Sequence, residues 1–244
     1  NKIPVHIRHP YAGKLVFTAF SGSHQDAINK GVKAMQERKQ DWWEVPYLPI
    51  DPADVGRKYE PIVRINSQSG KGGVAFVMDT YFGFKLPKGM HKEFANVIQK
   101  ISEKQGEVSP DQIMESFREE YLNQKEPIHF RKLRVDDLSG ETQSEFDTKV
   151  FVTYTNNGVE KSFEAIGNGP IDAFVHALES VGVCDYTFVD YEQHAISTGS
   201  DSKAVSYIQL MTPQGKRIFG VGISSNIYRS SLFGVINAIN RAEK

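Results

Sequence analysis

The fold of the C-terminal half is decided by the stretch VTYTNNGVEKSF at residues 152–163. An Asn-Gly pair between two runs rich in β-branched and aromatic residues is a strong hairpin signal, because both residues accept the positive φ of a tight turn. The sequence therefore predicts strands over 147–155 and 159–166. A helix is expected to follow from Pro170, since proline is favoured at the first helical position.

The same pattern recurs further along the chain, with a turn at Pro213-Gln214-Gly215. Gly158 and Gly215 are 57 positions apart, and the same offset carries Ile171 to Tyr228 and Val175 to Leu232. Matching elements at one offset predict a duplicated β-β-β-α unit, the alternative being a coincidence of two common hairpin-plus-helix units. The second copy is expected to comprise strands 204–212 and 216–223 and a helix from about Ile227.

The N-terminal half shows a different alternation of elements. Ser109 before Pro110, with Gln112 three residues on, predicts a capped helix start. The predicted fold class is α+β, with small α/β linker subdomains followed by a regulatory domain of two pseudo-symmetric β-β-β-α units. The predicted domains are residues 1–60, 61–126 and 127–244. The other predicted elements are strands 14–20, 61–66 and 73–82, and helices from Ser23 to about 38 and from Pro87.

Composition excludes several classes of protein. The 244 residues carry a formal net charge of −1 and a single cysteine, Cys184. One thiol excludes an internal disulfide framework and fits a reducing compartment, so a cytoplasmic location is expected. The apolar runs are too short to span a bilayer, and the basic residues are too dispersed to predict nucleic-acid binding. The chain starts at Asn1 instead of methionine, which suggests a piece of a longer protein.

Two kinds of chemical site are judged absent from the sequence. The stretch Ser69-Gly70-Lys71-Gly72-Gly73 resembles a phosphate loop, but Ile65 and Gly72 stand where a Walker A loop needs Gly and Ser or Thr. We interpret this stretch as a tight turn between two strands. The seven histidines form no His-x-His or His-Glu-x-x-His pair, so no metal site is predicted.

Two residues of the N-terminal half are candidates for catalysis. His24 lies at a predicted helix start, where the helix dipole favours a neutral imidazole that can accept a proton. The alternative is an exposed histidine with no role. Tyr47 lies between Pro46 and Pro49, so a rigid turn could aim its hydroxyl at a substrate, or the ring could simply pack.

A third candidate is the start of the helix in the first repeat. The stretch Gly167-Asn168-Gly169-Pro170 allows close backbone approach, and free N–H groups at a helix start bind a carboxylate or phosphate. The alternative is a plain strand-to-helix turn. Tyr191, Ala195 and Ala204 belong to or flank a stretch rich in small residues that could form the wall of a compact apolar pocket.

Several stretches together resemble one enzyme family. They are RHPYAG at residues 8–13, FSGSHQDAI at 20–28, VPYLPIDP at 45–52, NSQSGKGG at 66–73 and GNGP at 167–170. They resemble the long, leucine-regulated branch of the 2-isopropylmalate synthases, over the whole length of the chain. The resemblance implies an acyltransferase parent that condenses acetyl-CoA with 2-oxoisovalerate and is inhibited by L-leucine. It also implies a homodimer and a (β/α)₈ barrel, with a divalent Zn, Mg or Mn ion, that is missing from this segment.

The resemblance also assigns roles to residues. His24 matches the catalytic histidine of the family, and Tyr47 matches a tyrosine at the mouth of the active site. The 182–191 loop is one residue longer than in relatives, which affects the register from Phe188 to Tyr191. Asp172 replaces a small residue and is expected to change leucine affinity or to pair with the ligand's ammonium group. The implied leucine-binding residues are Gly167, Asn168, Gly169, Ile171, Asp172, Phe188, Tyr191, Ala195, Ala204 and Ile227.

Other interpretations remain at this point. The chain could be a stand-alone module that binds an amino acid, or the same region of a citramalate or homocitrate synthase. A nucleotide-binding protein is the least favoured, because the phosphate-loop spacing fails. We expect the segment alone to be inactive, because the metal and keto-acid sites of the family lie in the barrel. No cofactor is expected within the segment.

Overall fold

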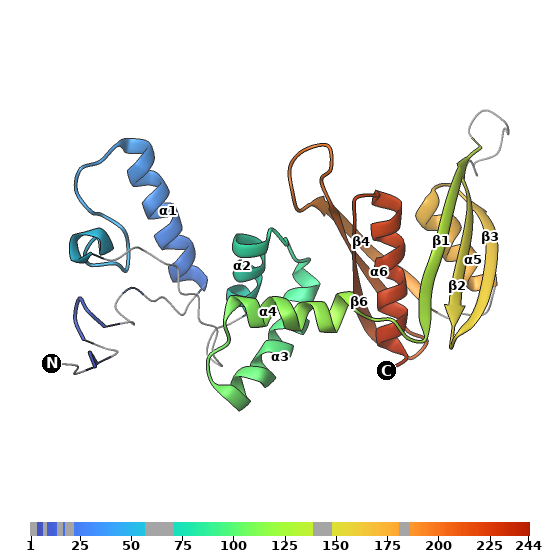
Figure 1. The fold of residues 1–244 in the computed structure, drawn as a ribbon, viewed down its shortest axis with the longest axis horizontal. Coiled ribbons are helices and arrows are strands. Elements are labelled where there is room, and N and C mark those ends of the chain that lie inside the picture. The colour runs from blue at the N-terminus through green and yellow to red at the C-terminus, as the bar shows by residue number, and fades with distance from the viewer. Residues whose placement is uncertain are drawn as a thin grey trace. The chain divides into compact units, whose positions relative to one another are not determined.

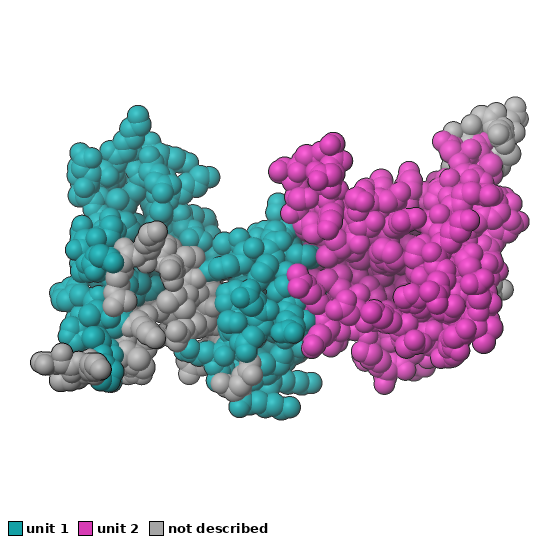
Figure 2. Space-filling view, in the orientation of Figure 1, with its two compact units in different colours: residues 1–116 teal, residues 117–244 magenta. Residues whose placement is uncertain are grey.

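The computed structural model describes residues 4–6, 9–13, 17, 22–56, 71–138, 148–180 and 186–244. The chain divides into two compact units, residues 1–116 and residues 117–244 (Figure 2). The predicted start of the regulatory domain at residue 127 lies inside the second unit. The predicted strands over 61–66 and, except for residue 17, over 14–20 lie outside the described residues.

Unit 1 is helical in its described part. Its elements are α1 (Gly22–Arg38), the short 3₁₀ helix η1 (Pro52–Val55), α2 (Lys71–Phe82), α3 (Lys88–Gln105) and α4 (Pro110–Phe117) (Figure 1). The predicted cap of α4 is confirmed, because Ser109 Oγ accepts from the amide of Gln112 at 3.3 Å and Gln112 Oε1 accepts from the amide of Ser109 at 2.9 Å. This reciprocal pair satisfies two amides that a helix start would otherwise leave free.

The prediction of a strand over 73–82 is wrong, because these residues belong to helix α2. A short apolar run cannot be assigned to helix or strand by periodicity alone. Val74, Val77 and Met78 are all buried, and their spacing is that of one helix face. The phosphate-loop-like stretch therefore leads into a helix at Lys71, although the failed Walker A spacing still argues against a nucleotide site.

Unit 2 begins with a short π-helical turn, η2 (Arg118–Leu122), and contains two three-stranded antiparallel sheets, each with its own helix (Figure 1). The first sheet has the order β1-β2-β3 and the second has the order β4-β5-β6. The elements are β1 (Ile128–Asp137), β2 (Thr148–Asn156), β3 (Val159–Gly167), α5 (Pro170–Ser180), β4 (Thr187–Ala195), β5 (Ala204–Met211), β6 (Arg217–Ser224) and α6 (Ile227–Ala242).

The structure confirms the duplicated unit. Each repeat has its hairpin between the second and third strands, and the turn glycines Gly158 and Gly215 adopt φ values of 79° and 78°. Helices α5 and α6 begin at Pro170 and Ile227, again 57 positions apart. The first strand of each repeat carries a register shift, after Phe130 in β1 and after Phe188 in β4. Residues 187–191, interpreted as loop from the sequence, belong to β4 because they pair with β5.

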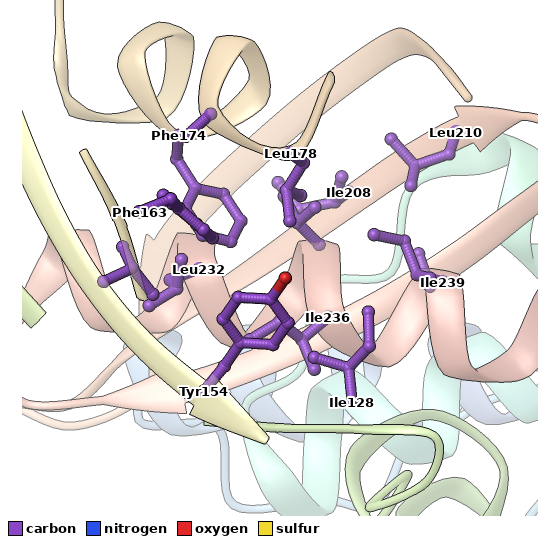
Figure 3. Close-up of a cluster of buried hydrophobic side chains, with 14 residues drawn as sticks. Ile128, Tyr154, Phe163, Phe174, Leu178, Ile208, Leu210, Leu232, Ile236 and Ile239 are labelled. Carbon is purple, nitrogen blue, oxygen red and sulfur yellow. The ribbon is translucent and has the colours of Figure 1, made fainter. Parts of the chain in front are cut away.

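One hydrophobic core joins the two repeats of unit 2. Helix α5 packs on β2 and β3, while α6 packs on β5 and β6 and also contacts β1. The core therefore draws on both sheets and both helices, and apolar burial is the main force that holds the repeats together. Figure 3 shows this core and labels Ile128, Tyr154, Phe163, Phe174, Leu178, Ile208, Leu210, Leu232, Ile236 and Ile239.

Helix α6 lies unusually close to its sheet at Gly222. A Cβ atom at this position would lie 1.9 Å from the carbonyl oxygen of Ser230 and 2.6 Å from the amide of Gly234. These are backbone atoms that cannot rotate away. The missing side chain of Gly222 therefore fixes the distance between β6 and the first turns of α6.

Candidate functional site

The start of α5 lies directly against the end of β3. A Cβ atom on Gly167 would lie 2.3 Å from the amide nitrogen of Ala173, so only glycine allows this approach. The amide of Ala173 donates to the carbonyl of Gly169 at 2.9 Å and closes the first turn of the helix. Asn168 and Gly169 span the short connection between strand and helix. The predicted geometry, a glycine-rich turn leading into a helix start, is therefore present.

A carboxylate of the chain itself occupies part of this helix start. Asp172 Oδ2 accepts a hydrogen bond from the amide of Asn168 at 3.1 Å, and Asp172 Oδ1 lies 3.7 Å from His176 Nε2. The sequence left open whether Asp172 changes affinity or contacts a ligand ammonium group. In the structure Asp172 contacts the backbone amide of Asn168 and the imidazole of His176. A ligand carboxylate at the same helix start would meet this negative charge.

The other predicted wall residues lie in the second repeat. Ala195 on β4 and Ala204 on β5 are direct cross-strand partners, and Ile227 is the first residue of α6. Tyr191 on β4 reaches the same helix, because its hydroxyl accepts from Ser231 Oγ at 3.4 Å. Phe188 differs from the others, since it packs against the hydrophobic core.

The two helix starts meet at a small cavity. Pro170 and Ile171 of α5 line it together with Tyr228 and Ser231 of α6. Its volume is about 10 Å³, which is room for about one water molecule. Of the predicted leucine-binding residues, Ile171 alone is among those that line this cavity, and Tyr191 is joined to it through Ser231. An amino acid therefore needs more space than this cavity offers.

Sequence reasoning missed a buried polar network beneath this cavity. Gln193 Nε2 donates to Ser206 Oγ at 2.7 Å and to Ser230 Oγ at 2.9 Å, and Ser206 Oγ lies 3.3 Å from Ser231 Oγ. Ser206, Ser230 and Ser231 are almost fully buried. The available signal was a serine within the apolar strand 204–211, because buried hydroxyl groups need partners. The network ties β4 and β5 to the first turn of α6.

A larger cavity lies elsewhere in unit 2. Its volume is about 390 Å³, and Gln124, Phe130, Gly222, Phe233 and Asn237 are among the residues that line it. None of the residues predicted from the sequence contributes to it. The volume alone is in the range of small-molecule pockets. The backbone amides that could bind a carboxylate lie at the helix starts and not at this larger cavity. We therefore keep the helix starts as the candidate effector site.

The two candidate catalytic residues of unit 1 lie side by side. The rings of His24 and Tyr47 stack with their centroids 4.1 Å apart and their planes 26° apart. His24 is the third residue of α1, and Tyr47 lies in the turn after the helix with 61% of its surface exposed. Residues 23 positions apart in the sequence thus present an imidazole and a phenol at one exposed place.

The described residues offer no metal site. Among them, no group of three or more His, Cys, Asp or Glu side chains is placed to hold an ion. The donor set that the family resemblance implies for a divalent metal is therefore not found among the described residues. None of the helices in that part of the chain combines the length and apolar character that a bilayer span requires.

Comparison with known proteins covers both units. Residues 14–79 match the family model described as alpha-isopropylmalate synthase, post-catalytic domain-like, and residues 107–243 match the LeuA allosteric (dimerisation) domain. The chain belongs to the 2-isopropylmalate synthase family. The first match contains His24 and Tyr47, and the second contains every predicted leucine-binding residue.

Individual 2-isopropylmalate synthases are similar to the chain over almost its full length. The enzyme of Clostridium acetobutylicum is 49% identical over 243 residues, which is 99% of this chain and 43% of that protein. The enzyme of Brucella suis is 45% identical over 99% of this chain and 43% of its own length. The enzyme of Mycobacterium ulcerans is 46% identical over 100% of this chain and 44% of its own length. The chain thus spans less than half of these synthases and corresponds to their C-terminal part. The described residues form two small sheets and no (β/α)₈ barrel.

Proposed function

We propose that the chain is the linker and leucine-sensing portion of a cytoplasmic, homodimeric 2-isopropylmalate synthase. The parent enzyme would condense acetyl-CoA with 2-oxoisovalerate and respond to L-leucine as a feedback inhibitor. The observation that carries this proposal is the meeting of two helix starts, α5 and α6, inside a region that matches an allosteric domain. Duplicated units with facing helix starts are suited to hold a small zwitterion.

Leucine would be bound by complementary parts of the two repeats. Its carboxylate would accept hydrogen bonds from the backbone amides of Asn168 and Gly169 at the start of α5, where the helix dipole favours negative charge, and would compete with Asp172 for the amide of Asn168. Its isobutyl group would pack against Ile171, Tyr191 and the alanines Ala195 and Ala204, with Ile227 beside them. Because the cavity has room for only about one water molecule, binding requires the first turns of α5 and α6 to separate.

That opening supplies a route for regulation. A ligand shifts a conformational equilibrium only when it binds the two states differently. Leucine would bind the opened form, and the buried network from Gln193 to Ser206 and Ser230 would pass the movement of α6 to the second sheet. In the parent enzyme the same shift would lower the activity.

His24 and Tyr47 would serve the condensation. A neutral imidazole can accept a proton, and the stacked phenol can donate a hydrogen bond to a substrate oxygen. The keto-acid site of the parent would be supplied by the barrel. We therefore expect no release of free thiol when this chain alone is incubated with acetyl-CoA and 2-oxoisovalerate. Thiol release above the blank would contradict this expectation.

Calorimetry tests the effector proposal on this chain. L-leucine is expected to give binding heat and a thermal shift at millimolar concentration, and D-leucine is expected to bind more weakly. Tyr191→Ala should weaken binding, whereas Tyr81→Ala should not, since Tyr81 lies in unit 1 with the same 36% exposure as Tyr191. The proposal fails if the unaltered chain shows neither heat nor a shift, or if both variants lose binding equally.

A further inference from the structure

The turn that carries Tyr47 is anchored to the chain on both sides. Val45 and Leu48 are buried, with 5% and 3% of their surfaces exposed, in a small core that also contains Ile28 of α1. The indole of Trp43 donates from Nε1 to the carbonyl of Leu48 at 2.8 Å. The residues on either side of the exposed pair Pro46 and Tyr47 are thus fixed.

Tyr47 has a backbone conformation that needs such anchoring. Its φ is 63°, in the left-handed region, where a residue with a side chain is destabilised by about 1–2 kcal/mol. Strained residues of this kind persist only where the surroundings determine them, and they concentrate at functional sites. In this left-handed conformation the phenol of Tyr47 stacks on the imidazole of His24.

Helix α1 makes room for the turn at a single residue. A Cβ atom on Gly31 would lie 2.6 Å from Pro46 Cδ and 3.4 Å from Val45 Cγ1. The Cδ atom belongs to the proline ring and is bonded to the backbone nitrogen, so it cannot move without moving the turn. Gly31 is seven positions after His24, and residues seven apart lie on the same face of a helix. One face of α1 therefore carries both the imidazole and the contact for Pro46.

We infer that Gly31 is a positioning residue, which sets the stack of Tyr47 on His24 by allowing Pro46 to touch the backbone of α1. The inference rests on the proposed function for the roles of His24 and Tyr47, but the geometry that it asserts is independent of those roles. A methyl group at position 31 would lift Pro46 from the helix and move the adjacent phenol away from the imidazole.

The experiment measures the stack directly in the 244-residue chain. An aromatic ring stacked at 4.1 Å displaces the imidazole proton resonances of His24 upfield. His24→Gln assigns these resonances, and Tyr47→Leu gives their position without the ring. Gly31→Ala is expected to lose most of the displacement. Gly72→Ala is the matched control, since Gly72 also lies in a helix of unit 1 and its added Cβ would have no heavy atom within 4 Å.

A double variant isolates the steric conflict. Pro46→Ala removes the Cδ atom, so adding Gly31→Ala to Pro46→Ala should leave the His24 resonances where Pro46→Ala alone puts them. This comparison still decides the question if Gly31→Ala alone does not fold. The inference is overturned if Gly31→Ala keeps the full displacement or if Gly72→Ala removes it. It is also overturned if Gly31→Ala shifts the His24 resonances as much in the Pro46→Ala background as in the unaltered chain.

The same experiment separates this inference from the proposed function. Loss of the stack in Gly31→Ala, together with unchanged activity of the parent enzyme carrying His24→Ala, would reject the catalytic role and leave the positioning role intact. An unchanged stack in Gly31→Ala would reject the positioning role and leave the catalytic role untouched.

Discussion

Asn240, near the end of α6, binds both backbone polar groups of Ile128, the first residue of β1. The amide of Ile128 donates to Asn240 Oδ1 at 2.9 Å, and Asn240 Nδ2 donates to the carbonyl of Ile128 at 2.7 Å. Both residues are almost fully buried. The last helix of the second repeat therefore holds the first strand of the first repeat, 112 positions away in the sequence.

Loss of this carboxamide should destabilise unit 2. Asn240→Ala removes the hydrogen bonds to both groups of Ile128 and to the carbonyl of Gln124, and we expect the free energy of unfolding to fall by about 2–4 kcal/mol. Urea denaturation followed by far-UV circular dichroism measures the change. Asn123→Ala is the control, because Asn123 is exposed, and its effect should stay within about 0.5 kcal/mol. Equal effects of the two substitutions would contradict the prediction.

A methyl group between α6 and its sheet should be costly. In Gly222→Ala the new Cβ atom would overlap the carbonyl of Ser230, so α6 must shift, and we expect a loss of at least about 3 kcal/mol in unfolding free energy. Gly72→Ala, where a Cβ meets no atom within 4 Å, should be neutral or stabilising by up to about 1 kcal/mol. Thermal denaturation distinguishes the two. A tolerated Gly222→Ala would show that α6 sits further from β6.

The hydroxyl of Tyr154 is a buried polar group that has no hydrogen-bond partner among the described residues. Only 1% of the residue is exposed, and its oxygen, red in Figure 3, lies among aliphatic side chains with no hydrogen bond from the described residues. Tyr154→Phe should therefore raise the unfolding free energy, by about 1 kcal/mol at neutral pH. Tyr207→Phe is a useful comparison, since the equally buried Tyr207 hydroxyl lies 3.3 Å from His194 Nε2. That substitution should be destabilising.

The same tyrosine should give the stability a pH dependence. Burial raises the pKa of Tyr154 above its ordinary value of about 10, because the folded protein disfavours the phenolate. Above this ordinary value the unfolded chain releases the proton and the folded chain keeps it. The unfolding free energy therefore falls as the pH rises past about 10. The advantage of Tyr154→Phe over the unaltered chain should grow between pH 9 and pH 11, and a constant difference would argue against burial as the cause.

Substitution of Asp172 tests whether its negative charge weakens leucine binding at the candidate effector site. Asp172→Asn keeps an oxygen for the amide of Asn168 but removes the negative charge, so leucine should bind several-fold more tightly, by on the order of 1 kcal/mol. Calorimetry measures the affinity, with Glu164→Gln as a control for overall charge because Glu164 pairs with Lys149 outside this site. Weaker binding to Asp172→Asn would instead indicate that Asp172 contacts the ammonium group of leucine.

Sequence patterns predicted the features that a few neighbouring residues determine. The Asn157-Gly158 turn and the reciprocal cap between Ser109 and Gln112 form as expected, because their hydrogen bonds close within about four residues. Helix α2 shows the opposite case. Its run from Gly73 to Met78 suits a buried strand or a buried helix, and only the burial of Val74, Val77 and Met78 against the rest of unit 1 settles which one forms.

The sequence by itself determined that the C-terminal half is a repeated β-β-β-α unit, since turn glycines, strand patterns and helix starts recur at one offset. The tertiary structure alone decided which distant groups meet. It placed Asn240 on Ile128, stacked His24 on Tyr47, and closed the space between Ile171 and Ser231 to about 10 Å³. Local backbone preferences act between near neighbours in the sequence. Long-range pairs depend instead on how buried surfaces fit together once the chain has closed, and no local pattern encodes that fit.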